Sequence, residues 1–146
     1  MWKAGSTRRK MAHNDKTIRV LICNQYTLFR EGLKALLDHA SVNRGGHIEV
    51  SGEAHLAKDA IEMLIRLRPD VVLMDVNFPD LSGAEATRRV KAIAPGVEVL
   101  IVSLSDDKPL ISRCMQAGAS GFIRTNDLPM KLTSAIQSVS RRAHAA

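Results

Sequence analysis

The chain has 146 residues, of which 45% are hydrophobic, and this size and composition fit one domain with a substantial core. No stretch approaches the roughly 18 consecutive apolar residues of a membrane-spanning helix, and the first residues lack the apolar block of a secretory signal. We therefore expect a cytoplasmic protein without membrane contact. The two cysteines, Cys23 and Cys114, lack the spacing of a zinc site or a disulfide framework, so we expect both to be small buried residues.

The net charge of +6 is concentrated at the two ends of the chain. Residues 1–16 contain five basic residues and one acidic residue, and Arg141 and Arg142 follow at the other end, so residues 17–140 sum to zero. A basic arm can contact phosphate groups, but one without interleaved aromatic residues is more often simply solvated. We predict a flexible basic tail over residues 1–16, a domain over residues 17–142 and a short tail over residues 143–146.

From Thr17 onward, short β-rich runs alternate with longer segments of helical periodicity, in five pairs. The first, third and fourth runs are almost continuously apolar, which is typical of strands that are buried on both faces. The predicted strands are residues 18–23, 48–52, 71–75, 98–103 and 121–124.

Apolar residues at helical spacing follow the first two strands. One face of the first predicted helix is formed by Phe29, Leu33, Leu36 and Ala40. One face of the second predicted helix is formed by Ala57, Ile61, Leu64 and Ile65. We expect both faces to pack against the sheet.

Capping residues mark the third and fourth predicted helices. Ser82 and Glu85 have the spacing of a capping box, which predicts a helix that starts near Ser82. The fourth helix is predicted to start near Asp106, with Pro109 in its first turn, and Gly118 should close it.

The fifth helix is predicted to begin with Asp127 as its cap and Pro129 just inside, and to run almost to the end of the chain. Its inward face should be formed by Leu132, Ile136 and Val139. Strands that alternate with helices require right-handed crossovers into a parallel sheet that helices cover on both faces. The predicted fold class is therefore doubly wound α/β, in which ligands bind at the carboxyl ends of the strands.

Polar residues stand at the carboxyl ends of four predicted strands, namely Asn24, Gln25, Asp75, Ser103 and Thr125. Asp75 is the one charged residue among them. A carboxylate at a strand end can accept a phosphoryl group as a nucleophile without prior deprotonation. Alternatively, Asp75 accepts hydrogen bonds from backbone N–H groups of the following loop, as aspartates in turns often do.

A resemblance to a known family is carried by four segments: IRVLICNQYTLFREGLKALL, RPDVVLMDVNFPDLSGAEATRRVK, VEVLIVSLSDD and QAGASGFI. The pattern MDxxFPDLSG is the most specific part. Residues 17 to about 140 resemble the CheY-like receiver domain of LuxR/NarL-type bacterial response regulators. The resemblance implies a five-stranded sheet in the order 2-1-3-4-5, with Asp75 as phosphoacceptor, Ser103 as the hydroxyl that follows the phosphoryl group and Phe122 as the aromatic residue that moves with it. The alternative for Ser103 is a strand-end hydroxyl bonded to backbone, and the alternative for Phe122 is a residue of the core.

Two features depart from the pattern of that family. Where it has two adjacent acidic residues after the first strand, this chain has Asn24 and Gln25, and where it has a lysine after the fifth strand, this chain has Thr125. The acidic pair helps to hold Mg²⁺, which prefers carboxylate ligands because they offset its charge. We therefore expect weak or absent Mg²⁺ binding, no other cofactor and inefficient phosphorylation of Asp75. The neighbouring Tyr26 either donates a hydrogen bond into this pocket or packs on the first helix.

Three functions remain open. The leading hypothesis is an atypical receiver, not an enzyme, that acts in two-component signal transduction or transcription regulation through contacts with a partner protein. The second is a functional receiver that a histidine kinase phosphorylates on Asp75. The third is a flavodoxin-like module that binds a small molecule at the same sheet edge, although the segment CNQYTLF is not a glycine-rich phosphate loop.

The expected partners are another protein or a histidine kinase, and a homodimer is an alternative. Family analogy places dimer surfaces on the first and fifth helices, or on the fourth helix, fifth strand and fifth helix, where Ile111, Met115 and Met130 could contribute. Too few residues follow position 140 for a helix-turn-helix domain, so we expect no sequence-specific DNA binding by this chain alone.

Overall fold

The computed structural model describes residues 17–44 and 47–145. The basic tail expected for residues 1–16 lies outside the described residues. The last helix runs to Ala145, and it therefore includes residues 143–145, which the sequence pattern assigns to a C-terminal tail. Within the described part of the chain, we find no helix that is both long enough and apolar enough to span a membrane.

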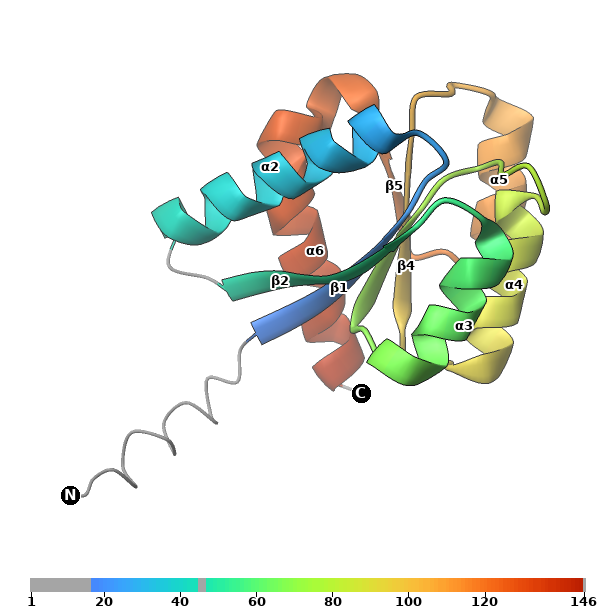
Figure 1. The fold of residues 1–146 in the computed structure, drawn as a ribbon, viewed down its shortest axis with the longest axis horizontal. Coiled ribbons are helices and arrows are strands. Elements are labelled where there is room, and N and C mark those ends of the chain that lie inside the picture. The colour runs from blue at the N-terminus through green and yellow to red at the C-terminus, as the bar shows by residue number, and fades with distance from the viewer. Residues whose placement is uncertain (1–16, 45–46, 146) are drawn as a thin grey trace.

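Five parallel strands form one sheet in the order β2-β1-β3-β4-β5, which confirms the predicted topology (Figure 1). The strands are β1 (Thr17–Cys23), β2 (His47–Ala54), β3 (Val71–Met74), β4 (Glu98–Ser103) and β5 (Gly121–Arg124). β3 stops one residue earlier than predicted, so Asp75 is the first residue of the loop that follows it. In the sheet, β3 lies between β1 and β4.

Helices cover both faces of this sheet, with α2 and α6 on one face and α3, α4 and α5 on the other (Figure 1). They are α2 (Thr27–Arg44), α3 (Ala57–Leu67), α4 (Gly83–Ile93), α5 (Lys108–Gln116), the short 3-10 helix η1 (Thr125–Asp127) and α6 (Leu128–Ala145). The fold is therefore the doubly wound α/β fold that the alternation of elements predicts.

The central strands are buried on both faces because successive side chains of a strand point to opposite sides of the sheet. In β1, Val20 and Ile22 pack with the residues of α2 and α6, whereas Leu21 and Cys23 pack with those of α3, α4 and α5. Full burial of each aliphatic side chain of this kind contributes about 1.5–3 kcal/mol. The two layers fix the register of β1, and with it the position of the residues that follow the strand.

The buried face of α3 differs from the prediction. Ala57, Ala60 and Leu64 are buried, whereas Ile65 is 64% exposed. Adjacent residues on a helix point about 100° apart, so Ile65 cannot share the buried face with Leu64. Ile61 is half-buried at the edge of this face.

The inward face of α2 is centred on Leu33 and Leu37, both of which are buried. Phe29 and Leu36 pack against the same core while remaining half-buried, and the side chain of Ala40 lies outside the described residues. Leu37 was missing from the predicted face, although its spacing of four from Leu33 is helical.

Side-chain caps start two of the helices. Ser82 caps α4 as predicted, because its Oγ accepts a hydrogen bond from the N–H of Glu85 at 3.0 Å. The cap of α5 is Asp107 and not Asp106, since a carboxylate oxygen of Asp107 accepts from Leu110 N–H at 3.2 Å. This shift by one residue brings Pro109 within the first two positions of the helix, where a proline is best tolerated.

Gly118 lies just after the end of α5, and Asp127 lies at the start of α6. Gly118 closes α5 as predicted, with a φ of 120° that L-residues rarely adopt. Asp127 lies directly before α6, at the position predicted for its cap, and is also the last residue of η1; its carboxylate lies 3.9 Å from Lys131 Nζ. The inward face of α6 is confirmed, and its buried residues include Leu132, Ile136 and Val139.

Both cysteines are free and buried, as expected. Burial raises the pKa of both thiols, and the pKa of Cys114 rises to about 11 because the negative charge of Asp75 adds to the effect of burial. Both side chains therefore stay protonated near neutral pH and act as small apolar residues.

Candidate functional site

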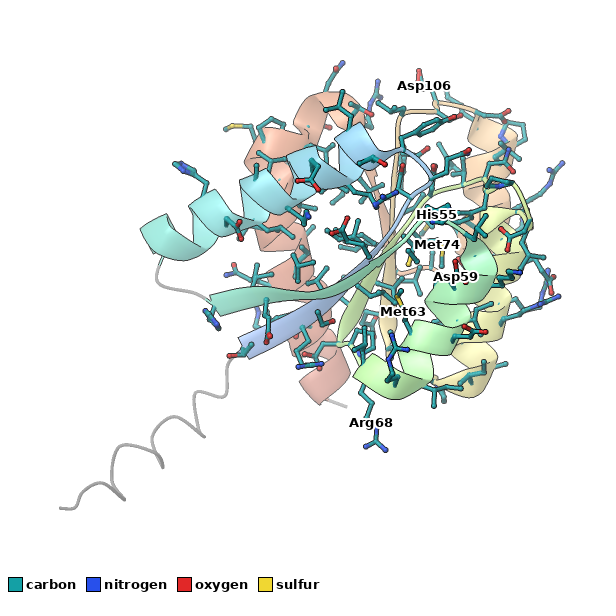
Figure 2. The ribbon with its side chains drawn as sticks, viewed as in Figure 1. His55, Asp59, Met63, Arg68, Met74 and Asp106 are labelled. Carbon is teal, nitrogen blue, oxygen red and sulfur yellow. The ribbon has the colours of Figure 1, made fainter. Side chains whose placement is uncertain are left out.

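Three polar side chains meet at the carboxyl edge of the sheet. Asn24 follows β1, Asp75 follows β3 and Ser103 ends β4, and these strands are neighbours in the sheet. All three residues are almost completely buried, with exposed fractions of 2%, 5% and 3%. Figure 2 shows the orientation of the sheet: Asp106, in the loop after β4, lies at the edge that carries the site, and Arg68, in the loop before β3, lies at the opposite edge.

The carboxylate of Asp75 accepts three hydrogen bonds. Ser103 Oγ–H donates to Oδ1 at 2.5 Å, and the N–H of Val76 donates to the same oxygen at 2.7 Å. Asn24 Nδ2–H donates to Oδ2 at 3.1 Å. All of these donors are neutral, so they orient the carboxylate without offsetting its charge. The bond from Val76 fits the second reading of Asp75, in which the side chain caps its own loop.

Burial raises the pKa of Asp75 above its ordinary value. The hydrogen bonds from Ser103 and from the N–H of Val76 act in the opposite direction, but they do not outweigh the loss of hydration. A nearby cation would lower the pKa of such a carboxyl group. The donors Ser103, Val76 and Asn24 are neutral, so none of them supplies a charge that would lower the pKa of this carboxyl group in that way.

The orientation of the Asn24 amide follows from its two hydrogen bonds. Its Oδ1 accepts from the N–H of Tyr26 at 2.8 Å, so its Nδ2 must be the atom that faces Asp75. An amide nitrogen of this kind donates hydrogen bonds and is not a ligand for Mg²⁺, which takes oxygen ligands. Asn24 thus presents a donor, and not an oxygen, to the carboxylate of Asp75.

Gln25 and Thr125 lie beside this cluster but do not reach the carboxylate. Gln25 Nε2–H donates to the carbonyl oxygen of Asn77 at 3.4 Å, and Thr125 Oγ1–H donates to the carbonyl oxygen of Ser103 at 2.7 Å. The side chain of Thr125 therefore binds the backbone at the end of β4. Neither side chain brings a charge to Asp75.

Phe122 lies on β5, the edge strand next to β4. It is half-buried and packs against the core beneath α3, α4 and α5, where it lines a small cavity with Ile111 and Arg124. Of the residues that sequence analysis selected, the structure thus brings Asn24, Asp75 and Ser103 into direct contact. Phe122 takes no part in these hydrogen bonds.

A hollow of about 380 Å³ opens beside Asp75. Its walls come from the loops after β1, β3 and β4, and its lining residues are Gln25, Tyr26, Asp75, Val76, Asn77, Ser103, Leu104, Ser105 and Leu110. Sequence reasoning had selected four of these residues or had left their role open. It missed the other five, Val76, Asn77, Leu104, Ser105 and Leu110, although their places directly after the strand-end residues Asp75 and Ser103 and at the start of the next helix were a usable signal.

Arg30 is a basic residue that contacts the backbone of Asn24, next to the cluster of Asn24, Asp75 and Ser103. Its guanidinium donates to the carbonyl oxygen of Asn24 at 2.7 Å, and its Nε lies 3.0 Å from Glu53 Oε1. Glu53 also lies 2.7 Å from Lys34 Nζ. The positive charge of Arg30 is therefore paired with Glu53. Across the described residues, no group of three or more His, Cys, Asp or Glu side chains is arranged to hold a metal ion.

The loop that follows Asp75 is shaped by two close contacts. The N–H of Gly83 donates to the carbonyl oxygen of Val76 at 2.8 Å, and a Cβ atom at position 83 would lie only 2.1 Å from the carbonyl oxygen of Asp75. Asp80 accepts hydrogen bonds from the N–H groups of Ala57 and Lys58 at 3.0 and 2.9 Å, so it caps α3 from another part of the chain. The segment FPDLSG therefore has structural tasks.

The comparisons with known proteins agree with this fold. The model of the response regulator receiver domain matches residues 20–137. The chain is 34% identical over 122 residues to the response regulator UvrY of Escherichia coli K12, an alignment that covers 84% of this chain and 54% of UvrY. It is 37% identical over 123 residues to the transcriptional regulatory protein MctR of Rhizobium johnstonii, covering 84% of this chain and 55% of MctR.

Solved structures give the same result. The fold is similar to that of a two-component response regulator of the LuxR family from Aurantimonas sp. SI85-9A1, with a TM-score of 0.75 and 27% sequence identity, covering 86% of both chains. The chain spans about half the length of the curated relatives that it matches.

Proposed function

Because this chain belongs to the response regulator receiver family and is similar to regulators of the LuxR/NarL type, we propose that it is an atypical receiver. In this proposal it acts in two-component signalling through contacts with a partner protein, and Mg²⁺-dependent phosphorylation of Asp75 is impaired. It catalyses no reaction of its own.

The hydrogen bond from Asn24 Nδ2 to Asp75 is the observation that carries the proposal. The family pattern has an acidic residue at this position, whose oxygen atoms attract Mg²⁺. Here the atom that faces Asp75 is a hydrogen-bond donor, and the amide oxygen is already bound by the N–H of Tyr26. A metal ion would therefore have to break both bonds before Asn24 could offer it an oxygen.

Electrostatics support the same conclusion. Mg²⁺ and a lysine would neutralise the negative charge that builds up on a phosphoryl group during transfer. Thr125 stands at the position of the lysine, and its hydroxyl group binds the backbone of β4. A phosphorylated Asp75 would carry about −1.5 to −2 charges in a buried site whose contacting donors are all neutral. The residues present therefore do not fit a resident Mg²⁺ ion.

A second candidate is a receiver that a cognate histidine kinase phosphorylates on Asp75. It is favoured by the position of Ser103, which contacts Asp75 directly, and by the hollow of about 380 Å³, which has room for a phosphoryl group. Kinase-dependent transfer of labelled phosphate to wild type, lost in Asp75→Asn, would favour this candidate.

The partner of the atypical receiver is another protein, a histidine kinase or a second copy of this chain. In this proposal, residues 17–142 do not bind DNA in a sequence-specific way.

Intact-mass spectrometry after incubation with acetyl phosphate and Mg²⁺ tests the proposal. We expect wild type to show no stable adduct, whereas a receiver with a complete acidic pair and lysine, treated in parallel, should gain the mass of one phosphoryl group. A clean mass gain in wild type that disappears in Asp75→Asn would show that the metal-assisted reaction is intact.

A further inference from the structure

A second hollow, here named the α2–α6 hollow, lies between α2 and the start of α6, which are side by side in the fold (Figure 1). Its volume is about 720 Å³, within the range of roughly 300–1,000 Å³ that is typical of small-molecule sites. It is lined by Tyr26, Leu28, Phe29, Gly32, Leu33, Leu36, Leu104, Thr125, Leu128 and Pro129.

The chemistry of this lining is almost purely apolar. Among the lining residues that the structure describes, none is charged, and the hydroxyl groups of Tyr26 and Thr125 are the polar side-chain atoms. Three large apolar side chains at the rim remain exposed to solvent, with exposed fractions of 84% for Leu28, 58% for Leu104 and 52% for Tyr26. Water is a poor occupant of such a surface, and an ionic ligand would find no partner for its charge.

Gly32 supplies an independent observation. It lies inside α2, where glycine is less favourable than alanine because it loses more backbone freedom on folding. A Cβ atom at this position would meet no other atom within 4 Å, so the packing of the described residues does not require a glycine. Gly32 lines the hollow without a side chain, so an occupant can approach the backbone of the helix at this wall.

We infer that the α2–α6 hollow is a binding site for an uncharged small molecule with an apolar body and a polar group within reach of Tyr26 or Thr125. The described lining offers no charged side chain to pair with a phosphate group, so we expect the ligand to be neither a nucleotide nor a phosphate-bearing cofactor. The inference does not depend on the proposed function, because the lining does not include Asp75.

The two hollows share part of their walls. Tyr26 and Leu104 line both of them, and Thr125 of the α2–α6 hollow donates a hydrogen bond to the carbonyl oxygen of Ser103. A molecule seated between α2 and α6 would therefore contact residues that adjoin the Asp75 cluster. Its binding should change the amide resonances of Ser103 and Ser105, the residues directly before and directly after Leu104.

A pair of fluorescent probes that differ in one charged group tests the inference. N-phenyl-1-naphthylamine is uncharged, and 8-anilinonaphthalene-1-sulfonate is the same molecule with an added sulfonate. We expect the uncharged probe to bind the full chain saturably, with one site and a Kd on the order of tens of micromolar, as a ligand of this size allows. We expect the sulfonate to bind at least about tenfold more weakly, because the lining offers no counter-charge.

Gly32→Leu fills the hollow from its wall, and Gly96→Leu is the matched control, because a Cβ atom at position 96 also meets nothing within 4 Å and Gly96 does not line the hollow. Gly32→Leu should weaken binding of the uncharged probe by at least about tenfold, whereas Gly96→Leu should leave it unchanged. Thermal unfolding followed by circular dichroism checks that each variant folds, and Gly32→Met, with a more adaptable side chain, replaces Gly32→Leu where that variant does not.

Three outcomes would overturn the inference. The first is the absence of saturable binding to wild type, and the second is equal binding to wild type and to a folded filling variant. The third is a concentration-dependent dimer of wild type in sedimentation experiments that Gly32→Leu dissociates and the uncharged probe does not, which would assign the surface to a second copy of the chain.

Discussion

The loop after β3 and the loops after β1 and β5 meet at the same edge of the sheet, but they contribute to it in different ways. The loop after β3 is fixed by close backbone contacts, with Gly83 against the carbonyl oxygen of Asp75 and Asp80 against the start of α3. The loops after β1 and β5 contribute neutral hydrogen bonds through Asn24 and Thr125.

The difference teaches that the position of Asp75 and the charge around it are set by separate parts of the chain. The loop after β3 maintains the geometry that presents a buried carboxylate at the end of that strand. The loops after β1 and β5 are the other two loops at this edge. The other two loops decide whether a cation is present to offset its charge, and here they supply none. The residues that position Asp75 are therefore distinct from those that surround it with neutral groups.

The largest expected effect comes from breaking the geometry. Gly83→Ala places a Cβ atom against backbone that cannot move aside cheaply, so we expect a loss of about 3 kcal/mol in the free energy of unfolding. Urea denaturation measures it. Gly96→Ala is the matched control, because a Cβ atom at position 96 meets nothing within 4 Å, and its effect should stay within about 0.5 kcal/mol. Similar stabilities of the two variants would refute the close approach.

The second largest effect is expected from introducing the two carboxylates and the lysine of the family pattern. The triple variant Asn24→Asp, Gln25→Asp, Thr125→Lys returns two carboxylates and one cation to an edge whose geometry is unchanged. We expect the rate of Asp75 labelling by acetyl phosphate and Mg²⁺ to rise by at least about 100-fold, the size of effect that one electrostatic contact in a transition state can have. Intact-mass time courses measure it, and Asp75→Asn in the same background is the control. A variant that binds Mg²⁺ but stays unlabelled would show that charge is not what wild type lacks.

A smaller effect is expected from the contact between the β3 loop and α3. The position before α3 is occupied by Leu56, which has no capping side chain, so Asp80 supplies the cap from a distance of 23 residues in sequence. Burial alone would raise the pKa of Asp80, but the N–H groups of Lys58 and Ala57 lower it overall. Asp80→Ala should cost about 1 kcal/mol in unfolding experiments.

Asp106→Ala is the control for that measurement, since Asp106 is exposed and does not cap α5. Its effect should stay within about 0.5 kcal/mol. An equal loss in both variants would mean that Asp80 acts only through its general charge.

The smallest expected effect is a change in pH dependence. Burial raises the pKa of Asp75 in the folded chain, so the folded state holds the proton more tightly than the unfolded state. The stability that this proton contributes is fully present below the unfolded pKa, near about 3.9, and is lost as the pH rises through the folded pKa. Asp75→Asn should therefore lose less stability than wild type as the pH rises above about 4. A steeper loss in the variant would reverse the sign of the shift.

Most of the fold could be predicted from the sequence because local patterns determine it. The apolar runs of β1, β3 and β4 are almost continuous, and the capping of α4 by Ser82 depends on residues three apart. Ile65 was assigned to the wrong face because apolar residues at positions 64 and 65 both fit a helical pattern, and only packing decides between them.

The site was predicted less completely, for a physical reason. The contacts of Asp75 with Asn24 and Ser103 follow from strand ends that adjoin in the sheet, so their meeting was foreseeable. The orientation of the Asn24 amide and the cap supplied by Asp80 depend on hydrogen bonds between residues far apart in sequence. The apolar hollow between α2 and α6 is a space that packed side chains leave empty. The spacing of residues along the sequence does not predict such a space.

A Mg²⁺ titration of wild type, followed by nuclear magnetic resonance at the side-chain amide of Asn24 and the backbone amide of Val76, tests the central claim most directly. With metal added up to about 10 mM, a range that oxygen-rich protein sites respond to, we predict no saturable shift at either position. Saturable shifts of both resonances at low millimolar metal, with loss of the hydrogen bond from Asn24 to Asp75, would contradict the account.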